Sequence, residues 1–382
     1  MGRTNISKAV LLLVAILAIA SPLIGGCAPT AAPAPTKAPA SDTKASAPAA
    51  TEAPASTKPA AQAAPSSTGK LEELKVADAV SFAYAPLYWA IEKGYFKEQG
   101  IDLKLDTAVS AADVVAFLAN GQLDMAGGGL SAGYFNAIAR GLDVKIVSPM
   151  GILPPKHGSV MIVASNALYE KASTKTAAAL KGKKVAINAP GGIIEYILTK
   201  ALQKEGLDLK DVQTEVIAFP DMPAALASGK VDAIVAAEPS ATKAVKMGAG
   251  KVLVDDIVPG KSTTVFLASP KLIAERPQVL KNFMVAWMRG VRDLQNGSDL
   301  YSPDKMAVWV KYTKLPAETI KAMVPFIWDP DLNIQRDIIE DQQKVHGDHG
   351  LLNYKQPVPV EKMIDDTFVK YAREKLGPWK KQ

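Results

Sequence analysis

The sequence predicts an α/β protein built as two similar lobes. Two observations lead to this prediction: a strand–turn–helix pattern over residues 184–198, and a group of segments that recurs at nearly one offset. Beyond the first 70 residues, 312 remain, which is enough for one large two-lobed domain or two smaller ones.

The strand–turn–helix pattern is the clearest local feature. Residues 185–187 are apolar and predict a short buried strand, residues 188–192 are turn formers, and apolar positions from Ile193 to Leu198 predict a helix. Such a turn directs backbone N–H groups of the helix N-terminus to the sheet edge where open α/β folds bind ligands. The alternative for any single turn of this kind is an ordinary connection without a ligand.

The recurring segments favour the functional interpretation. Residues 75–77 recur at 184–186, residues 96–104 at 202–210, and residues 118–124 at 226–232, with offsets of 109, 106 and 108. Each half is therefore predicted to run strand, helix, strand, helix, strand. We expect Gly121 and Gly229 to end helices in the left-handed conformation. Asp124 and Asp232, at strand starts, are predicted to serve as turn or cap carboxylates.

Four loops follow the carboxyl ends of the predicted strands: residues 78–85, 127–131, 188–192 and 237–240. Pro86 stands at the start of the helix after the first loop, where proline is favoured. If the lobes face each other, these loops line one cleft, a common place for a small-molecule site. The predicted ligand-binding residues are Phe82, Tyr84, Pro86, Gly128, Gly129, Ser131, Asn188, Gly191, Gly192 and Glu238.

The N-terminal 26 residues predict a signal peptide. Arg3 and Lys8 precede an apolar run over 9–24, and Gly25 and Gly26 precede Cys27, the one cysteine of the chain. This end resembles a bacterial lipobox, which implies that Cys27 is lipidated and becomes the mature N-terminus. The alternative is a plain membrane anchor, because the apolar run is just long enough to span a bilayer.

Residues 27–70 predict a tether. Of the 43 residues after Cys27, 35 are Ala, Pro, Ser or Thr. Such a composition offers no apolar face, so burial cannot offset the entropy of ordering it, and the prolines keep it extended.

The charge balance does not indicate a nucleic-acid partner. The chain has 44 basic and 38 acidic residues, but six of the basic and only two of the acidic ones lie in residues 1–70. The remainder has a net charge of about +2, without a clustered basic helix carrying aromatic residues.

The sequence offers no convincing catalytic, metal or cofactor site. The histidines are His157, His346 and His349, and the last two are predicted to be exposed loop residues because Gly347 and Gly350 flank them. The glycines at 127–129 lack the spacing of a dinucleotide-binding loop. With its cysteine assigned to lipidation, the chain shows no nucleophile–base pair.

The region after Pro270 is predicted to be mostly helical, with an apolar stripe that we assign to the core. The stripe consists of Leu280, Phe283, Met284, Trp287, Met288 and Val291. Trp89, inside the first helix, is likewise assigned to the core.

Residues 84–96, Y-A-P-L-Y-W-A-I-E-K-G-Y-F, resemble the opening of solute-binding proteins of the SsuA/THI5-like (NMT1) family. Residues 118–124, 180–185 and 277–290 are similar to further segments of that family. The resemblance implies a periplasmic-binding-protein type II fold that closes on a ligand and delivers it to an ABC importer. It also implies hinge strands near 159–164 and 263–268, so lobe 1 comprises residues 71–159 plus 266–382 and lobe 2 comprises residues 160–265.

The family binds anions such as sulfonates and nitrate, and also thiamin-precursor-like or flavin-like heterocycles. The candidate loops contain no arginine but do contain Glu238, and a buried carboxylate suits an N–H donor better than an anion. Phe82 and Tyr84 offer flat apolar surface. We therefore expect a small organic solute of mixed polarity, with a simple sulfonate as the alternative.

The function predicted from the sequence is an extracytoplasmic receptor, anchored in the cell envelope by lipid. Its partners are a small solute, an ABC permease and its ATPase, and it is expected to be a monomer without enzymatic activity. Two alternatives stay open: an exported enzyme on the same fold, and a receptor that signals to a membrane partner.

Overall fold

The computed structural model describes residues 70–79, 81–106, 114–295 and 299–380. The predicted signal peptide, Cys27 and the tether up to Gly69 lie outside the described residues. Within these ranges, no helix is both long and apolar enough to cross a membrane.

The first sheet has five strands in the order β2-β1-β3-β10-β4. The strands are β1 (Glu72–Ala77), β2 (Ile101–Asp106), β3 (Met125–Gly128), β4 (Lys145–Pro149) and β10 (Val265–Ala268). Strand β1 pairs in parallel with β2 and β3, whereas β10 is antiparallel to β3 and β4.

The second sheet repeats this arrangement in the order β7-β6-β8-β5-β9. Its strands are β5 (Val160–Ser165), β6 (Lys184–Ile187), β7 (Gln213–Val216), β8 (Ala233–Ala237) and β9 (Gly250–Val254). Strand β6 is parallel to β7 and β8, and β5 is antiparallel to β8 and β9. The predicted repeat is therefore confirmed at the level of strand order and direction.

Each sheet takes its antiparallel strand from the chain segment that crosses between the sheets. Strand β5 opens the second half of the fold, and β10 returns the chain to the first sheet. Both strands are buried along nearly their whole length, as expected for residues 160–163 and 265–267.

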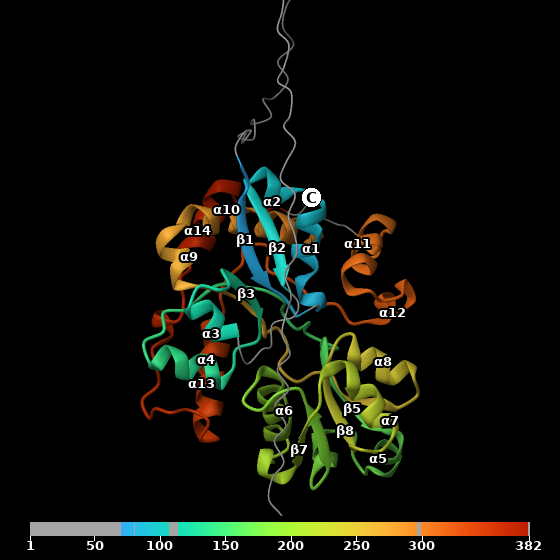
Figure 1. Ribbon diagram of the computed structural model, residues 1–382. Coiled ribbons are helices and arrows are strands. Elements are labelled where there is room, and N and C mark those ends of the chain that lie inside the picture. The colour runs from blue at the N-terminus through green and yellow to red at the C-terminus, as the bar shows by residue number, and fades with distance from the viewer. Residues whose placement is uncertain (1–69, 80, 107–113, 296–298, 381–382) are drawn as a thin grey trace, which may run out of the picture. The chain divides into compact units, whose positions relative to one another are not determined.

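Helices cover both sheets. They are α1 (Ala85–Glu92), α2 (Tyr95–Glu98), α3 (Val114–Ala119), α4 (Ala132–Ala139), α5 (Asn166–Lys171), α6 (Ile193–Gln203), α7 (Met222–Ala227), α8 (Ser240–Lys246), α9 (Pro270–Glu275), α10 (Pro277–Gln295), α11 (Pro303–Thr313), α12 (Ala317–Ala322), α13 (Arg336–Asp348) and α14 (Thr367–Leu376). Helix α6 lies on one side of the second sheet, and α7 and α8 lie on the other (Figure 1). The helical region predicted after Pro270 is confirmed.

Helix α10 supplies the centre of the core beside the first sheet. All six residues of its predicted apolar stripe are fully buried, and the Trp287 and Phe266 rings pack edge-to-face at 5.0 Å. Gly290 allows α10 to approach α1, because a Cβ there would lie 2.4 Å from the Pro86 carbonyl oxygen. The apolar stripe makes α10 strongly amphipathic, so one face of the helix is buried in the core.

The two halves also repeat the same backbone conformation and the same hydrogen bond just before corresponding strands. Gly121 and Gly229 have φ of 74° and 73°, as predicted for helix-ending residues. The carboxylate of Asp124 accepts a hydrogen bond from the Lys75 amide at 2.9 Å, and that of Asp232 accepts one from the Lys184 amide at the same distance. Each aspartate therefore ties the start of one strand to a neighbouring strand, β3 to β1 and β8 to β6, whereas the prediction was a local turn or cap carboxylate.

Candidate functional site between the two sheets

The loop after β1 leads through a short 3-10 helix (Phe82–Tyr84) into α1. The Ser81 side chain accepts a hydrogen bond from the Ala83 amide and so begins this turn. Pro86 stands in the first turn of α1, as predicted, where the missing N–H of proline costs nothing.

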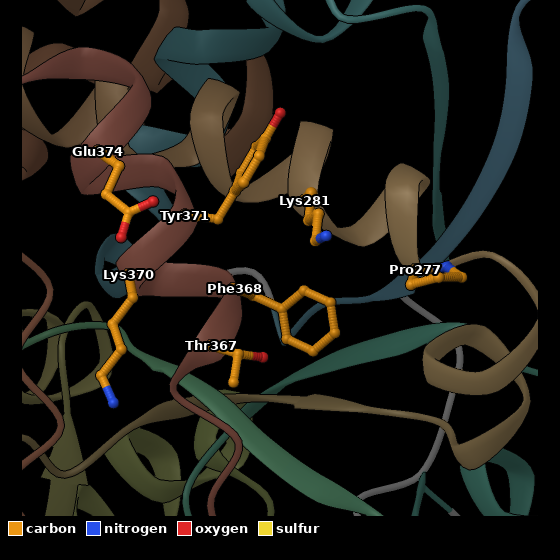
Figure 2. A pocket seen from close by; sticks show the side chains of 7 residues that line it. All are labelled: Pro277, Lys281, Thr367, Phe368, Lys370, Tyr371 and Glu374. Carbon is orange, nitrogen blue, oxygen red and sulfur yellow. The ribbon is translucent and has the colours of Figure 1, made fainter.

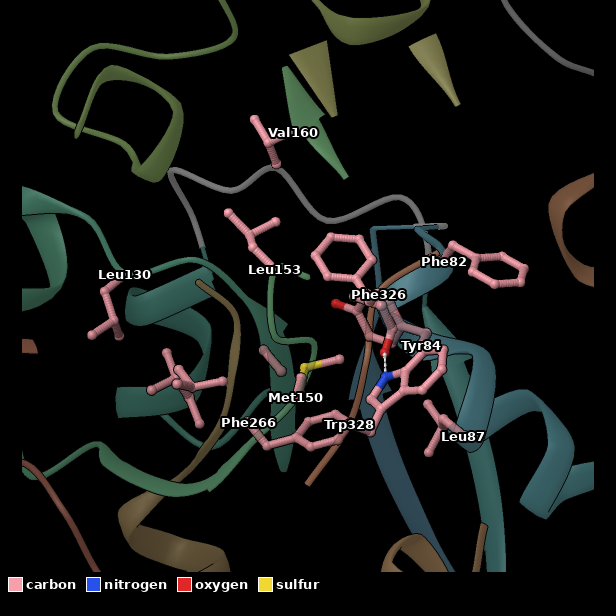
Figure 3. Packing of buried hydrophobic residues seen from close by; sticks show 14 of the residues in the cluster. Phe82, Tyr84, Leu87, Leu130, Met150, Leu153, Val160, Phe266, Phe326 and Trp328 are labelled. Atoms are coloured by element: carbon pink, nitrogen blue, oxygen red, sulfur yellow. Dashed lines mark hydrogen bonds between the residues drawn. The ribbon is translucent and has the colours of Figure 1, made fainter. Parts of the chain in front are cut away.

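The Phe82 ring is buried in a cluster of aromatic side chains. It packs edge-to-face against Trp309 at 5.5 Å between centroids and lies 6.4 Å from Trp328, whose indole N–H donates to the Ala83 carbonyl (Figure 3). Only 2% of Phe82 is exposed. The predicted core position of Trp89 is confirmed as well, since 8% of it is exposed.

Tyr84 lies directly over the end of β3. A Cβ at Gly127 would be 2.6 Å from the Tyr84 hydroxyl oxygen and 2.8 Å from the Met150 sulfur, so glycine is needed for this approach. The Phe266 ring packs edge-to-face against Tyr84 at 6.3 Å (Figure 3). Burial raises the pKa of the Tyr84 hydroxyl, and the charge of Asp78 raises it further.

The loop after β3 reaches the second sheet. Gly128 has φ of 150°, and a Cβ at Gly129 would lie 2.3 Å from a methyl carbon of Ile193 in α6. Ser131 caps α4 by accepting a hydrogen bond from the Tyr134 amide. These positions place the end of β3 in direct contact with the N-terminus of α6.

The loop after β6 completes this contact. The Gly191 carbonyl accepts a hydrogen bond from the Ala132 amide at 2.8 Å, and the Gly191 amide donates to Glu195 at 3.0 Å. Gly192 is the N-cap residue of α6, as predicted. The Asn188 side-chain oxygen is buried and has no hydrogen-bond partner among the described residues.

Glu238 lies at the end of β8 and is 2% exposed. One carboxylate oxygen accepts from the Thr242 hydroxyl at 2.8 Å and from the Val324 amide at 3.1 Å, and the other accepts from the Thr242 amide at 3.1 Å. Burial raises the pKa of Glu238, although these three hydrogen bonds oppose the rise. The carboxylate thus links β8 to the segment after α12.

The structure brings most of the predicted residues to the strand ends of the two sheets. Contacts join the loops after β3 and β6 across the sheets, whereas Phe82 packs against α11 and Glu238 contacts the segment after α12.

Four buried oxygens near these strand ends have no hydrogen-bond partner within the described protein. They are Asp78 Oδ1, Tyr84 Oη, Ser159 Oγ and Asn188 Oδ1. Folded proteins pair nearly all buried polar groups, so each such atom requires an explanation. The sequence singled out Tyr84 and Asn188, but it gave no indication that Asp78 and Ser159 would be buried there.

The prediction for two histidines is wrong. His346 is 1% exposed inside α13, and His349 ends that helix with its imidazole Nε2 at 2.9 Å from an Asp208 oxygen. Gly347 belongs to the helix rather than to a loop, because α13 gains enough buried contact to offset the low helix propensity of glycine. Burial lowers the pKa of His346 to about 4, and the nearby His349 adds to this effect. His157 is exposed.

Two hollows occur away from the strand ends. One of about 450 Å³ lies between α10 and α14, with Lys281, Lys370, Tyr371 and Glu374 around it (Figure 2). Another of about 240 Å³ lies beside α6 and α13, where Asp341 binds Tyr196 and Lys200. Neither is lined by a predicted site residue. In the described ranges, no cluster of three or more His, Cys, Asp or Glu side chains is arranged to hold a metal ion.

Two matched sheets whose strand ends meet define a class of fold, the two-lobed α/β architecture. The alkanesulfonate-binding protein SsuA from Xanthomonas axonopodis pv. citri has this fold with a TM-score of 0.60, at 19% identity, over 76% of this chain and 98% of that one. The periplasmic nitrate-binding protein NrtA from Synechocystis has it with a TM-score of 0.64, at 18% identity, over 80% and 89% of the two chains.

Residues 67–300 match the model of the NMT1-like family, and the chain belongs to that family. The putative aliphatic sulfonates-binding protein of Escherichia coli is 31% identical over 189 residues, or 48% of this chain and 54% of that protein. The formylaminopyrimidine-binding protein of Halalkalibacterium halodurans is 27% identical over 210 residues, or 53% and 60%. The chain thus spans little more than half the length of these curated relatives.

An enzyme also occurs among the relatives. A 4-amino-5-hydroxymethyl-2-methylpyrimidine phosphate synthase of Saccharomyces cerevisiae is 26% identical over 155 residues, or 41% of this chain and 42% of that protein. Relatives of this chain therefore include both binding proteins and a biosynthetic enzyme.

Proposed function

We propose that this protein is an extracytoplasmic receptor that binds a small organic solute between its two sheets. It delivers the solute to an ABC permease that is driven by an ATPase. Membership of the NMT1-like family and the names of two curated relatives, both binding proteins, support this role.

The observation that carries the proposal is the set of buried oxygens without partners at the strand ends of both sheets. Asp78 and Tyr84 follow β1 of the first sheet, and Asn188 follows β6 of the second. A ligand held between these strand ends would supply hydrogen-bond partners to oxygens from both sheets at once. The carboxyl ends of the strands are also where open α/β folds usually bind their ligands.

The proposed lining combines these atoms with apolar and backbone surface. Phe82, Tyr84 and Pro86 come from the loop and helix after β1, and Gly128, Gly129 and Ser131 come from the end of β3 and the start of α4. The second sheet contributes Asn188, Gly191, Gly192 and Glu238. The solute classes that fit are a flat heterocycle resembling a thiamin precursor or a flavin, and a sulfonate- or nitrate-type anion.

The proposed location is the cell envelope, with Cys27 as the lipid-bearing N-terminus after removal of residues 1–26. A Cys27→Ala variant is then expected to lose incorporation of radiolabelled palmitate and to leave the membrane fraction. Labelling and membrane association equal to those of the wild type would contradict this part of the proposal.

Thermal unfolding in the presence of candidate solutes tests the receptor role. The panel contains sulfonates, nitrate, bicarbonate, aromatic carboxylates, pyrimidines and flavins. A ligand that binds only the native state stabilises it by about 2.7 kcal/mol at a hundredfold excess over its dissociation constant. We expect a saturable rise in Tm of several degrees for one class, without conversion of the solute. Turnover of a solute would instead support an enzyme, and no rise with any class would contradict the proposed ligands.

A further inference from the structure

We propose that Asp78, held in place by Tyr88, selects solutes that carry N–H donors, such as amines, amidines and aminopyrimidines, over anionic solutes. This inference rests on the proposed receptor function and assigns the substrate class of the same site. It names a residue that the sequence analysis did not include among the candidate ligand-binding residues.

The Asp78 carboxylate has one oxygen engaged and one oxygen free. It directly follows β1, its backbone amide donates to the Asp106 carbonyl at 3.1 Å, and it is 6% exposed. Its Oδ2 accepts a hydrogen bond from the Tyr88 hydroxyl at 2.7 Å. Its Oδ1 is buried without any partner in the described protein. The free oxygen is an acceptor that requires a donor.

Tyr88 fixes which oxygen stays free. Its ring, in α1, is 1% exposed and stacks on Tyr312 at 4.4 Å with an interplanar angle of 10°. The Tyr312 hydroxyl donates to Glu92 at 2.8 Å, which holds the second ring in turn. Because the Tyr88 ring cannot turn away, its hydroxyl holds the Asp78 carboxylate in one orientation. Tyr88 is therefore a positioning residue.

The electrostatic surroundings of Asp78 oppose an anion. Burial raises the pKa of the Asp78 carboxyl, the hydrogen bond from Tyr88 opposes the rise, and the charge of Asp106 adds to it. Among the described residues, the charged side chain that shifts the pKa of Asp78 is the carboxylate of Asp106. A solute with an N–H donor or a positive charge offsets the cost of this burial, whereas a sulfonate increases it.

Tyr84 supplies a second polar atom beside Asp78. Its buried hydroxyl has no hydrogen-bond partner in the described protein, and the charge of Asp78 contributes to raising its pKa. A hydroxyl both donates and accepts, so Asp78 and Tyr84 together match a ring that presents an N–H group next to a ring nitrogen.

Glu238, the carboxylate expected from the sequence to recognise a donor, is arranged differently. Both of its oxygens accept hydrogen bonds from Thr242, and one also accepts from the Val324 amide. It therefore has protein donors on both oxygens, whereas Asp78 keeps one oxygen without any. This contrast assigns donor recognition to Asp78.

Isothermal titration calorimetry on the full chain tests the assignment with four probes. The donor probes are 4-amino-5-hydroxymethyl-2-methylpyrimidine and benzamidine, and the anionic probes are ethanesulfonate and nitrate. We expect a donor probe to bind the wild type more tightly than either anion. In Asp78→Asn we expect its affinity to fall by about tenfold or more, because a charge-assisted hydrogen bond is lost. The affinity ratio of donor to anion should fall with it.

Two further variants separate positioning from general damage. Tyr88→Phe keeps the ring stack but removes the hydroxyl, and we expect it to lower both the donor affinity and the donor-to-anion ratio. Tyr354→Phe is the matched control, because its hydroxyl donates to Gln343 and belongs to neither the Tyr88 ring stack nor the Asp78 contact, and we expect it to leave the ratio unchanged. If Asp78→Asn does not fold, Tyr88→Phe decides the question by the same ratio.

The outcomes distinguish this inference from the receptor proposal. Binding of a donor probe that is unaffected by Asp78→Asn and Tyr88→Phe overturns the role of Asp78 and leaves the receptor intact. A wild-type preference for ethanesulfonate or nitrate does the same. Failure of all four probes to bind the wild type counts against the receptor proposal and against this inference together.

Discussion

The Ala132 amide donates a hydrogen bond to the Gly191 carbonyl at 2.8 Å and so joins the loop after β3 to the loop after β6. These two loops leave corresponding edges of two sheets that share one strand order. The relationship shows that the strand ends of the two halves meet, which is the arrangement required of a receptor that encloses its ligand.

A substitution at Gly129 tests directly whether contact between the loops after β3 and β6 is needed for solute binding. A Cβ at this position would lie 2.3 Å from Ile193 Cγ2 and 2.5 Å from its Cβ, so Gly129→Ala forces the two loops apart. Overpacking of this kind costs about 1–3 kcal/mol, and we expect affinity for a stabilising solute to fall by about tenfold or more. The measurement is titration calorimetry.

Gly133→Ala is the matched control, because a Cβ there meets only the Ser131 hydroxyl oxygen at 3.5 Å. We expect this variant to bind like the wild type. Unchanged affinity in Gly129→Ala would show that solute binding does not depend on contact between these loops.

The two repeated aspartates, Asp124 and Asp232, should differ in their effect on stability. Asp232→Ala removes the acceptor of the Lys184 amide and is expected to lower the free energy of unfolding by about 1–3 kcal/mol. Asp124→Ala should cost more, because Asp124 also pairs with Arg276. Urea unfolding measures both, and the exposed Asp143→Ala serves as a control that should change little. A smaller loss for Asp124→Ala than for Asp232→Ala would contradict the contribution of Arg276.

Glu238 is expected to affect stability more than solute choice. Glu238→Gln replaces an acceptor by an amide N–H₂ group in front of protein donors, so we expect a loss of about 1–3 kcal/mol in the free energy of unfolding. Thr242→Val should cause a similar loss, and neither should alter the donor-to-anion ratio. A large change in the donor-to-anion ratio with unchanged stability would show that Glu238, and not Asp78, recognises the N–H donor of the solute.

His346 should make stability depend on pH between about 4 and 6.5. Its folded-state pKa is about 4, below the ordinary value of 6.5, so the unfolded chain binds more protons in this window. The contribution of His346 is therefore fully present above pH 6.5 and is lost as the pH falls toward 4, by about 3 kcal/mol in total.

Buried Asp78, Glu195 and Glu238 have raised pKa values and act in the opposite direction, so the test is a difference between two proteins. The stability of the wild type relative to His346→Gln should fall as the pH is lowered from 7 to 4. A constant difference would show that His346 is not held uncharged in the folded protein.

The sequence predicted the parts of the fold that local patterns determine. The repeated segments predicted the succession of strands and helices along each half, and the glycines at 121 and 229 predicted helix ends. The spacing of Leu280, Phe283 and Trp287 predicted the buried face of α10. Each of these features depends on neighbours in the chain or on a period of the helix, so residue order is sufficient to find them.

The features that the sequence missed depend on contacts between distant segments. His346 is buried because α13 packs against α4 and α6, which no local pattern near Gly347 indicates. Asp78 is buried because Tyr88 and Tyr84 close over the end of β1, and an aspartate after a strand ordinarily lies in solvent. Glu238 was singled out correctly as a loop carboxylate, but its partner Val324 is 86 residues away.

Hydrogen–deuterium exchange with and without the most stabilising solute tests the central claim most directly. A receptor that encloses its ligand between the two sheets should show slower exchange in residues 126–132 and in residues 188–194 together, because ligand and loop contact then protect both sets of amides. Protection of one set alone, or protection confined to α10 and α14 around the hollow of Figure 2, would contradict a binding site shared by the two sheets.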